Sequence, residues 1–63
     1  MNKIYIKLSD GSTVTSDFAD QIYTKNEILS FLECGQKPEE RRSFPLVNVI
    51  EYKIRDKWDT RPW

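Results

Sequence analysis

The sequence predicts a small α+β domain in which three antiparallel strands pack against one helix. Three observations support this prediction. Residues 3–8 alternate between apolar and polar side chains, residues 24–35 carry the signals of a capped helix, and residues 44–55 are rich in β-branched and aromatic side chains. The 63 residues of the chain are enough for one domain, residues 1–63, at the lower edge of independent folding.

The first two strands are predicted to form a hairpin. Residues 3–8 place three large aliphatic side chains on one face of a strand. Asp10 and Gly11 then favour a two-residue type I′ turn. Residues 12–16 return as a short edge strand, and residues 17–23 fit a loop or one helical turn.

A helix is predicted over residues 25–34. Thr24 and Glu27 have the spacing of a capping box, in which each side chain accepts a hydrogen bond from the other residue's amide. Gly35 provides a stop signal after the last turn. The apolar residues at helical spacing are Ile28, Leu29, Phe31 and Leu32.

The remaining chain divides into a charged loop, a third strand and a tail. Residues 36–43 contain no large apolar side chain, and residues 56–63 form a charged C-terminal tail. If the helix runs back along the sheet, the third strand lies beside the first, which gives the antiparallel order 2-1-3 with one face open. The predicted core comprises Ile4, Ile6, Leu8, Val14, Ile28, Phe31, Leu32, Ile50, Tyr52 and Ile54.

Composition excludes several classes of function. Ten basic and ten acidic residues are interspersed and give a net charge of zero, which removes the strong electrostatic argument for nucleic-acid or membrane binding. No apolar run has the length of a membrane span or an export signal, so we expect a cytoplasmic protein that does not bind membranes. The single cysteine, Cys34, excludes an intramolecular disulfide.

The sequence predicts no catalytic residue, cofactor or metal site. It contains no histidine, so Ser-His-Asp and Cys-His arrangements and imidazole metal ligands are absent. The carboxylate pairs Asp17/Asp20 and Glu39/Glu40 lie in predicted loops, whereas a general acid needs a desolvated or like-charge environment. We therefore do not expect an enzyme.

A protein-binding surface is predicted on the open face of the sheet. Tyr5, Val47 and Val49 give this face an apolar centre with a charged rim, as in modest protein interfaces. Trp58 is expected to close the end of the core, whereas Trp63 lies in an extended segment and is free to fold back or to anchor a partner. The predicted contact residues are Tyr5, Glu39, Glu40, Arg41, Arg42, Val47, Val49 and Trp63.

In its small size, its β-β-α-β order, its lack of a catalytic histidine and its charged edges, the chain resembles the small accessory proteins of bacteriophages and other mobile elements. Some of these are anti-CRISPR proteins that bind and block a Cas effector. The resemblance implies a non-enzymatic inhibitor that blocks the surface of a larger host or defence protein, such as a nuclease, in the bacterial cytoplasm.

Two alternatives stay open. One is a nucleic-acid-binding accessory protein, in which the adjacent Arg41 and Arg42 clamp phosphate groups. The other is a homo-oligomeric structural component, such as a homodimer through the open face of the sheet.

Overall fold

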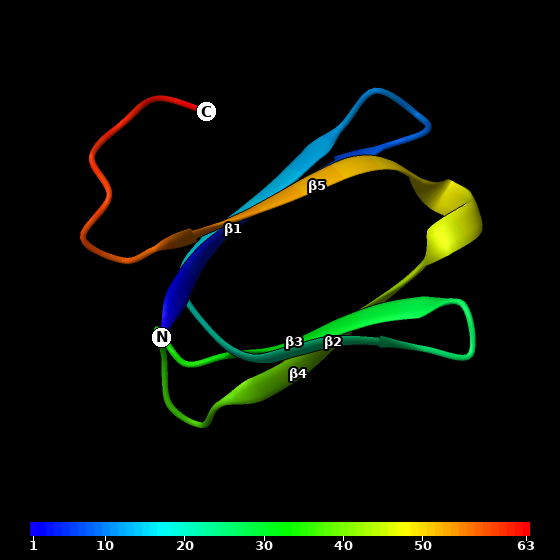
Figure 1. Ribbon diagram of the computed structural model, residues 1–63. Helices are drawn as coiled ribbons and strands as arrows, with labels where there is room; N and C mark the ends of the chain where they lie inside the picture. The colour runs from blue at the N-terminus through cyan, green and yellow to red at the C-terminus, as the bar shows by residue number, and fades with distance from the viewer.

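The computed structural model describes residues 1–63 and contains five antiparallel strands and no α-helix. The strands lie in one sheet in the order β4-β3-β2-β1-β5, which folds into two facing layers (Figure 1). The predicted α+β fold with three strands and one helix is therefore wrong, because the domain is nearly all-β. The elements are β1 (Asn2–Leu8), β2 (Thr13–Lys25), β3 (Ile28–Glu33), β4 (Glu40–Pro45), the 3₁₀ turn η1 (Leu46–Asn48) and β5 (Val49–Asp56).

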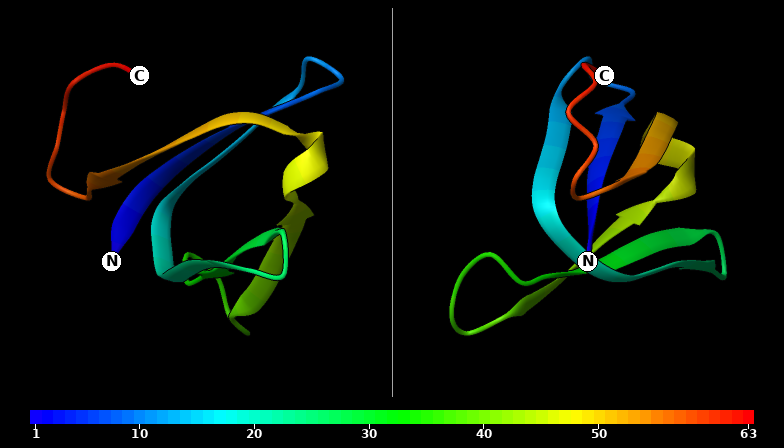
Figure 2. Two further views of the ribbon diagram at one scale, coloured as in Figure 1. Left: turned by 45° about the vertical axis from the view of Figure 1, so that its right-hand side comes forward. Right: turned by 60° about the vertical axis from the view of Figure 1, so that its left-hand side comes forward.

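Strand β2 belongs to both layers. Its first half pairs with β1 and its second half with β3, and the register shifts in both ladders near the middle of the strand. Gln21, at the second shift, has a positive φ of 47°. Bulges of this kind bend a strand and increase its twist, so β2 turns the sheet back on itself (Figure 2). The strands β4 and β5 are left as free edges.

The segment predicted as a helix forms the β2–β3 hairpin instead. Lys25 pairs with Ile28, and the two loop residues Asn26 and Glu27 have φ values of 52° and 63°, as a type I′ turn requires. The apolar run is short enough to fit the period of a helix or that of a strand. The pairing of β3 with both β2 and β4, and the burial of Leu29 and Phe31 in the core, favour the strand. The predicted capping box therefore does not form.

The first hairpin is confirmed, although its turn differs from the prediction. The amide of Gly11 donates to the carbonyl of Leu8 (3.0 Å), the amide of Leu8 donates to the carbonyl of Ser12 (2.9 Å), and only Gly11 has a positive φ. The loop thus has three residues rather than two. The return strand was predicted as a short edge strand, but β2 is the long central strand and includes residues 17–23.

The second half of the chain departs further from the prediction. Strand β4 begins inside the predicted charged loop, residues 36–43. The predicted third strand, residues 44–55, is divided among the end of β4, η1 and β5. One part of the predicted order holds, because β5 pairs antiparallel with β1 and places Tyr52 opposite Ile6.

The core lies between the two layers and is small. Phe31 is fully buried and stacks on Phe44, with ring centroids 6.3 Å apart. Three predicted core residues of β5, Ile50, Tyr52 and Ile54, are instead between 41% and 60% exposed, because no element covers this edge strand. Ile28, predicted as core, is also exposed beside the turn. The fully buried apolar residues are Ile4, Ile6, Ala19, Leu29 and Phe31.

The only helical segment is the three-residue turn η1, and no helix of this chain is long and apolar enough to cross a membrane.

Candidate functional site

The C-terminal tail folds back over the outer face of β1 and β5. The rings of Tyr5 and Trp63 stack with centroids 5.6 Å apart and an angle of 27° between their planes. The ammonium group of Lys53 donates to the main-chain oxygen of Trp63 (2.9 Å), and the Arg55 guanidinium lies 5.1 Å from the ring centroid of Trp63. We call Tyr5, Lys53, Arg55 and Trp63 the aromatic-cation cluster.

Short-range hydrogen bonds shape the tail. The carboxylate of Asp56 accepts from the amide of Trp58 (2.8 Å), which ends β5 in a turn. The carboxylate of Asp59 accepts from the amide and the guanidinium of Arg61, with a shortest distance of 2.6 Å. These hydrogen bonds hold the pKa of Asp59 well below its usual range. The tail is thus a defined loop that returns toward the sheet.

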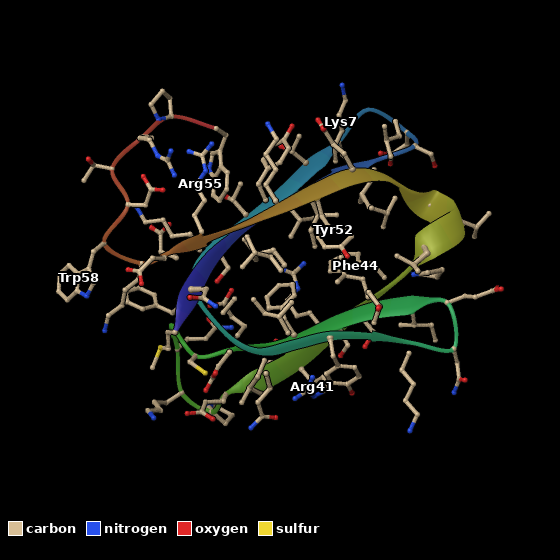
Figure 3. All side chains as sticks on the ribbon, viewed as in Figure 1. Lys7, Arg41, Phe44, Tyr52, Arg55 and Trp58 are labelled. Carbon is tan, nitrogen blue, oxygen red and sulfur yellow. The ribbon has the colours of Figure 1, made fainter.

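The prediction that Trp58 closes the end of the core is wrong, and it is Trp63 that packs on the domain. Trp58 does not close the core; it is 79% exposed and points away from the domain (Figure 3). The turn at Asp56 removes it from the face of β5 that continues into the core. Trp63 is 38% exposed and packs on the sheet. The expectation that Trp63 can fold back onto the outer face is therefore confirmed.

The outer face of β1 and β5 is cationic although the whole chain is neutral. The strand register places Lys3 opposite Arg55, Tyr5 opposite Lys53, and Lys7 opposite Glu51. Like charges on opposite strands repel. Two tail carbonyl groups reduce this repulsion, because Lys3 donates to the oxygen of Asp59 (2.8 Å) and Arg55 donates to that of Pro62 (2.7 Å). The tail therefore accepts hydrogen bonds from the cations of this face and covers Tyr5.

Arg41 lies on the outer face of the other layer. Its guanidinium donates to Oε1 of Gln21 (2.6 Å) and to Oγ of the buried Ser30 (3.0 Å), and it lies 5.3 Å from the ring centroid of Tyr23. A shallow groove of about 200 Å³ runs beside it. The groove is lined by Tyr23, Lys25, Asn26, Ile28, Ser30, Arg41 and Ser43, none of them acidic.

The adjacent Arg41 and Arg42 face opposite sides of β4. Arg42 is paired with the buried Phe31, and its guanidinium lies 5.5 Å from the ring centroid of Phe44. Successive residues of a strand point to opposite faces of the sheet. The two guanidinium groups therefore cannot clamp one phosphate, as the nucleic-acid alternative requires of them.

The predicted acidic residues lie away from the aromatic-cation cluster. Glu39 forms an exposed ion pair with Lys37 (3.5 Å). Glu40 begins β4 and, with Arg42 and Glu33, lines an open hollow of about 430 Å³. Because this hollow has no hydrophobic lining residue, it offers little apolar area to a ligand.

Val47 and Val49 do not form the centre of the open face. Val47 is 86% exposed on η1, and Val49 is half-buried opposite Leu8, against the core. Of the eight predicted contact residues, the structure stacks Tyr5 on Trp63 and places Glu40 and Arg42 on one hollow, but it does not bring all eight onto a single surface. Lys53 and Arg55 belong to the cluster but were not among the predicted contact residues. The sequence does indicate their position, because both alternate with Tyr52 and Ile54 and therefore lie on the outer face of β5.

Chemical groups that could support catalysis or metal binding are sparse. No three Asp, Glu or Cys side chains are grouped to hold a metal ion. Cys34 is half-buried, and burial followed by the neighbouring carboxylates raises the pKa of its thiol, so the reactive thiolate is disfavoured.

Comparison with known proteins identifies no relative. No protein-family model matches the chain, no curated protein matches its sequence, and no solved structure matches its fold.

Proposed function

We propose that this chain is a non-enzymatic protein-binding module whose contact surface is centred on the aromatic-cation cluster. The observation that carries the proposal is the Tyr5–Trp63 stack, held by hydrogen bonds from Lys53 and Arg55 to the tail. Trp, Tyr and Arg are the residue types that most often dominate the free energy of protein association. Because these side chains are already ordered, they lose little conformational freedom when a partner binds.

Charge indicates the kind of surface that the partner presents. Lys3, Lys7, Lys53 and Arg55 surround Tyr5, so an acidic patch on the partner complements this face. The β-β-α-β order no longer supports the resemblance to phage accessory proteins, but the small size, the lack of histidine and the charged edges still do. On these grounds we propose a larger host or defence protein of the bacterial cytoplasm as the partner. Binding would inhibit it by covering its surface. The cationic rim favours an acidic region of such a protein over the basic nucleic-acid channel of a nuclease.

A nucleic-acid-binding function is the second candidate, and the same face favours it. Single-strand-binding proteins combine cations for the backbone with aromatic rings that stack on bases. Neutralising four phosphates of a single strand would give a slope of about −3 in a plot of log K against log salt concentration. A protein partner lacks the condensed counterions of a nucleic acid, so its affinity falls less steeply with salt, and this slope distinguishes the two functions.

The test uses two tryptophan variants of the tail. The tagged wild-type chain, Trp63→Ala and Trp58→Ala are used to capture proteins from a bacterial lysate, and the captured protein is then purified and its Kd measured. We expect Trp63→Ala to weaken binding by at least about 30-fold, as expected for a residue that dominates an interface. Trp58→Ala is the matched control and should bind like the wild type, because its exposed ring lies against Lys57 and is not part of the aromatic-cation cluster.

Circular dichroism confirms that each variant is folded, and a labelled single-stranded oligonucleotide is titrated in parallel. Equal binding by Trp63→Ala and the wild type would remove the aromatic-cation cluster from the proposal. Oligonucleotide binding with a salt slope near −3, without capture of a protein, would favour the second candidate.

A further inference from the structure

The free edge of β5 carries exposed apolar side chains that the proposed contact surface does not use. Ile50, Tyr52 and Ile54 are all more than two-fifths exposed, and Tyr52 lies on the side of β5 that faces the other layer (Figure 3). β5 pairs only with β1, so its other edge presents unpaired amide and carbonyl groups. An exposed edge with apolar side chains is a template for pairing with another strand.

The sequence of β5 is complementary to itself about Tyr52. In an antiparallel pair of two β5 strands with Tyr52 opposite Tyr52, Ile50 of each copy lies opposite Ile54 of the other. The same register places Glu51 of each copy opposite Lys53 of the other. Apolar and opposite-charge pairs directly across an antiparallel ladder are both stabilising. Every cross-strand pair from residue 50 to residue 54 is therefore favourable.

We infer that β5 pairs with β5 of a second copy of this chain, giving a symmetric dimer with one continuous ten-stranded sheet. A two-fold axis through Tyr52 makes the contact isologous, so it closes after two copies. Trp58 follows β5 and Val47 precedes it, so the axis also brings the segment with Trp58 of one copy near the segment with Val47 of the other. These are the two most exposed large apolar side chains of the domain.

Existing contacts of these residues are compatible with the pairing. Lys53 donates to the oxygen of Trp63, but an ammonium group has three donors and keeps capacity for Glu51 of the other copy. The other free edge, β4, is less suited to self-pairing. It carries adjacent arginines, and Pro45 at its end has no amide hydrogen. The dimer therefore forms through β5 rather than β4.

Of the β5 residues paired from 50 to 54, only Lys53 also belongs to the aromatic-cation cluster, so the dimer and the proposed function can be tested separately. Pairing at the edge leaves the aromatic-cation clusters of both copies on the same outer side of the continuous sheet. Because the dimer test uses only the purified chain, a monomeric result would not exclude binding of a partner protein. Failure to capture a partner would likewise not exclude the dimer.

Charge reversal at the edge tests the inference. Sedimentation equilibrium of the purified chain should give twice the monomer mass of 7.5 kDa at high micromolar concentration. Glu51→Lys alone, or Lys53→Glu alone, replaces both opposite-charge pairs with like-charge pairs, so each should weaken dimerisation by at least about tenfold. The double variant Glu51→Lys/Lys53→Glu restores both pairs and should dimerise like the wild type.

A mixture gives the sharpest measurement. In an equimolar mixture of the two single variants, both cross-strand pairs are again opposite in charge, so a mixed dimer should form where each variant alone is monomeric. Asp17→Lys changes the charge equally on an exposed residue of β2 and should leave the dimer intact. Circular dichroism checks that every variant is folded.

Three results would overturn the inference. One is a wild-type chain that stays monomeric at high micromolar concentration. Another is a dimer that both single variants form as tightly as the wild type, which would place the interface elsewhere. The third is growth beyond two copies, which would exclude the closed two-fold pairing.

Discussion

Replacing Glu27 with glycine should stabilise the domain. Glu27 is the second residue of the β2–β3 turn and has a φ of 63°. A left-handed conformation costs a residue other than glycine about 1–2 kcal/mol. Glycine avoids this cost but loses about 0.5–1 kcal/mol more conformational freedom on folding. The Glu27 side chain is exposed and forms no hydrogen bond or ion pair, and its carbonyl, which accepts from the amide of Leu46 (2.8 Å), is kept in glycine.

The net gain is therefore about 0–1.5 kcal/mol in the free energy of unfolding, which raises Tm by up to about 12 °C in a domain of this size. Thermal melts followed by circular dichroism measure it. Lys25→Gly is the matched control and should lower Tm, because Lys25 is a strand residue without a positive φ. In the helix first predicted over residues 25–34, glycine at position 27 would be destabilising. A lower Tm for Glu27→Gly would thus refute the type I′ turn.

The remaining predictions concern the core, the tail and the thiol. Phe31→Ala should cost about 3–5 kcal/mol, a large part of the stability of so small a domain, and urea titration should show a chain that is largely unfolded without denaturant. Deletion of residues 58–63 should leave the domain folded by circular dichroism, with a loss of about 0.5–1.5 kcal/mol from the Tyr5–Trp63 stack; an unfolded product would contradict this. Because the pKa of Asp59 is lowered, its stabilisation of the tail is complete above the ordinary aspartate pKa of about 3.9 and is lost as pH falls through the lowered value. Trp63 fluorescence in a Trp58→Phe background should therefore change only in strong acid. When Arg61 is replaced by alanine in the same background, the change should occur at a higher pH. The raised pKa of Cys34 should make its alkylation by iodoacetamide at pH 8 slower than that of a free cysteine, as mass spectrometry can measure.

The sequence predicts the first hairpin and the pairing of the last strand with the first, because residues 3–8 and 51–55 alternate without ambiguity. It fails at residues 24–35, where one pattern fits two structures. Thr24 and Glu27 have capping-box spacing, yet Asn26 also tolerates the positive φ of a tight turn. Burial of Leu29 and Phe31 against the other layer decides between the two, and this is information that the local sequence does not contain.

The candidate site was predictable only in part, because the sequence shows residue types but not which strands lie side by side. Tyr5 and Trp63 were selected by residue type, and the structure brings them together. The cationic rim was not predicted, because acidic and basic residues balance along the sequence. Strand pairing nevertheless places Lys3 beside Arg55, although they are far apart in the chain. The phosphate clamp predicted from Arg41 and Arg42 fails because a strand places neighbouring side chains on opposite faces.

The pairing of β1 with β5 also determines when the domain can fold during synthesis. The β1–β2, β2–β3 and β3–β4 pairs are all between strands adjacent in the chain and can form soon after each strand leaves the ribosome. Asn2, however, pairs with Asp56, and this long-range pairing completes the layer formed by β1, β5 and the first half of β2. Contacts between distant residues slow folding. A nascent chain that lacks β5 therefore leaves Ile4 and Ile6, which are fully buried in the finished domain, without their strand partners Ile54 and Tyr52.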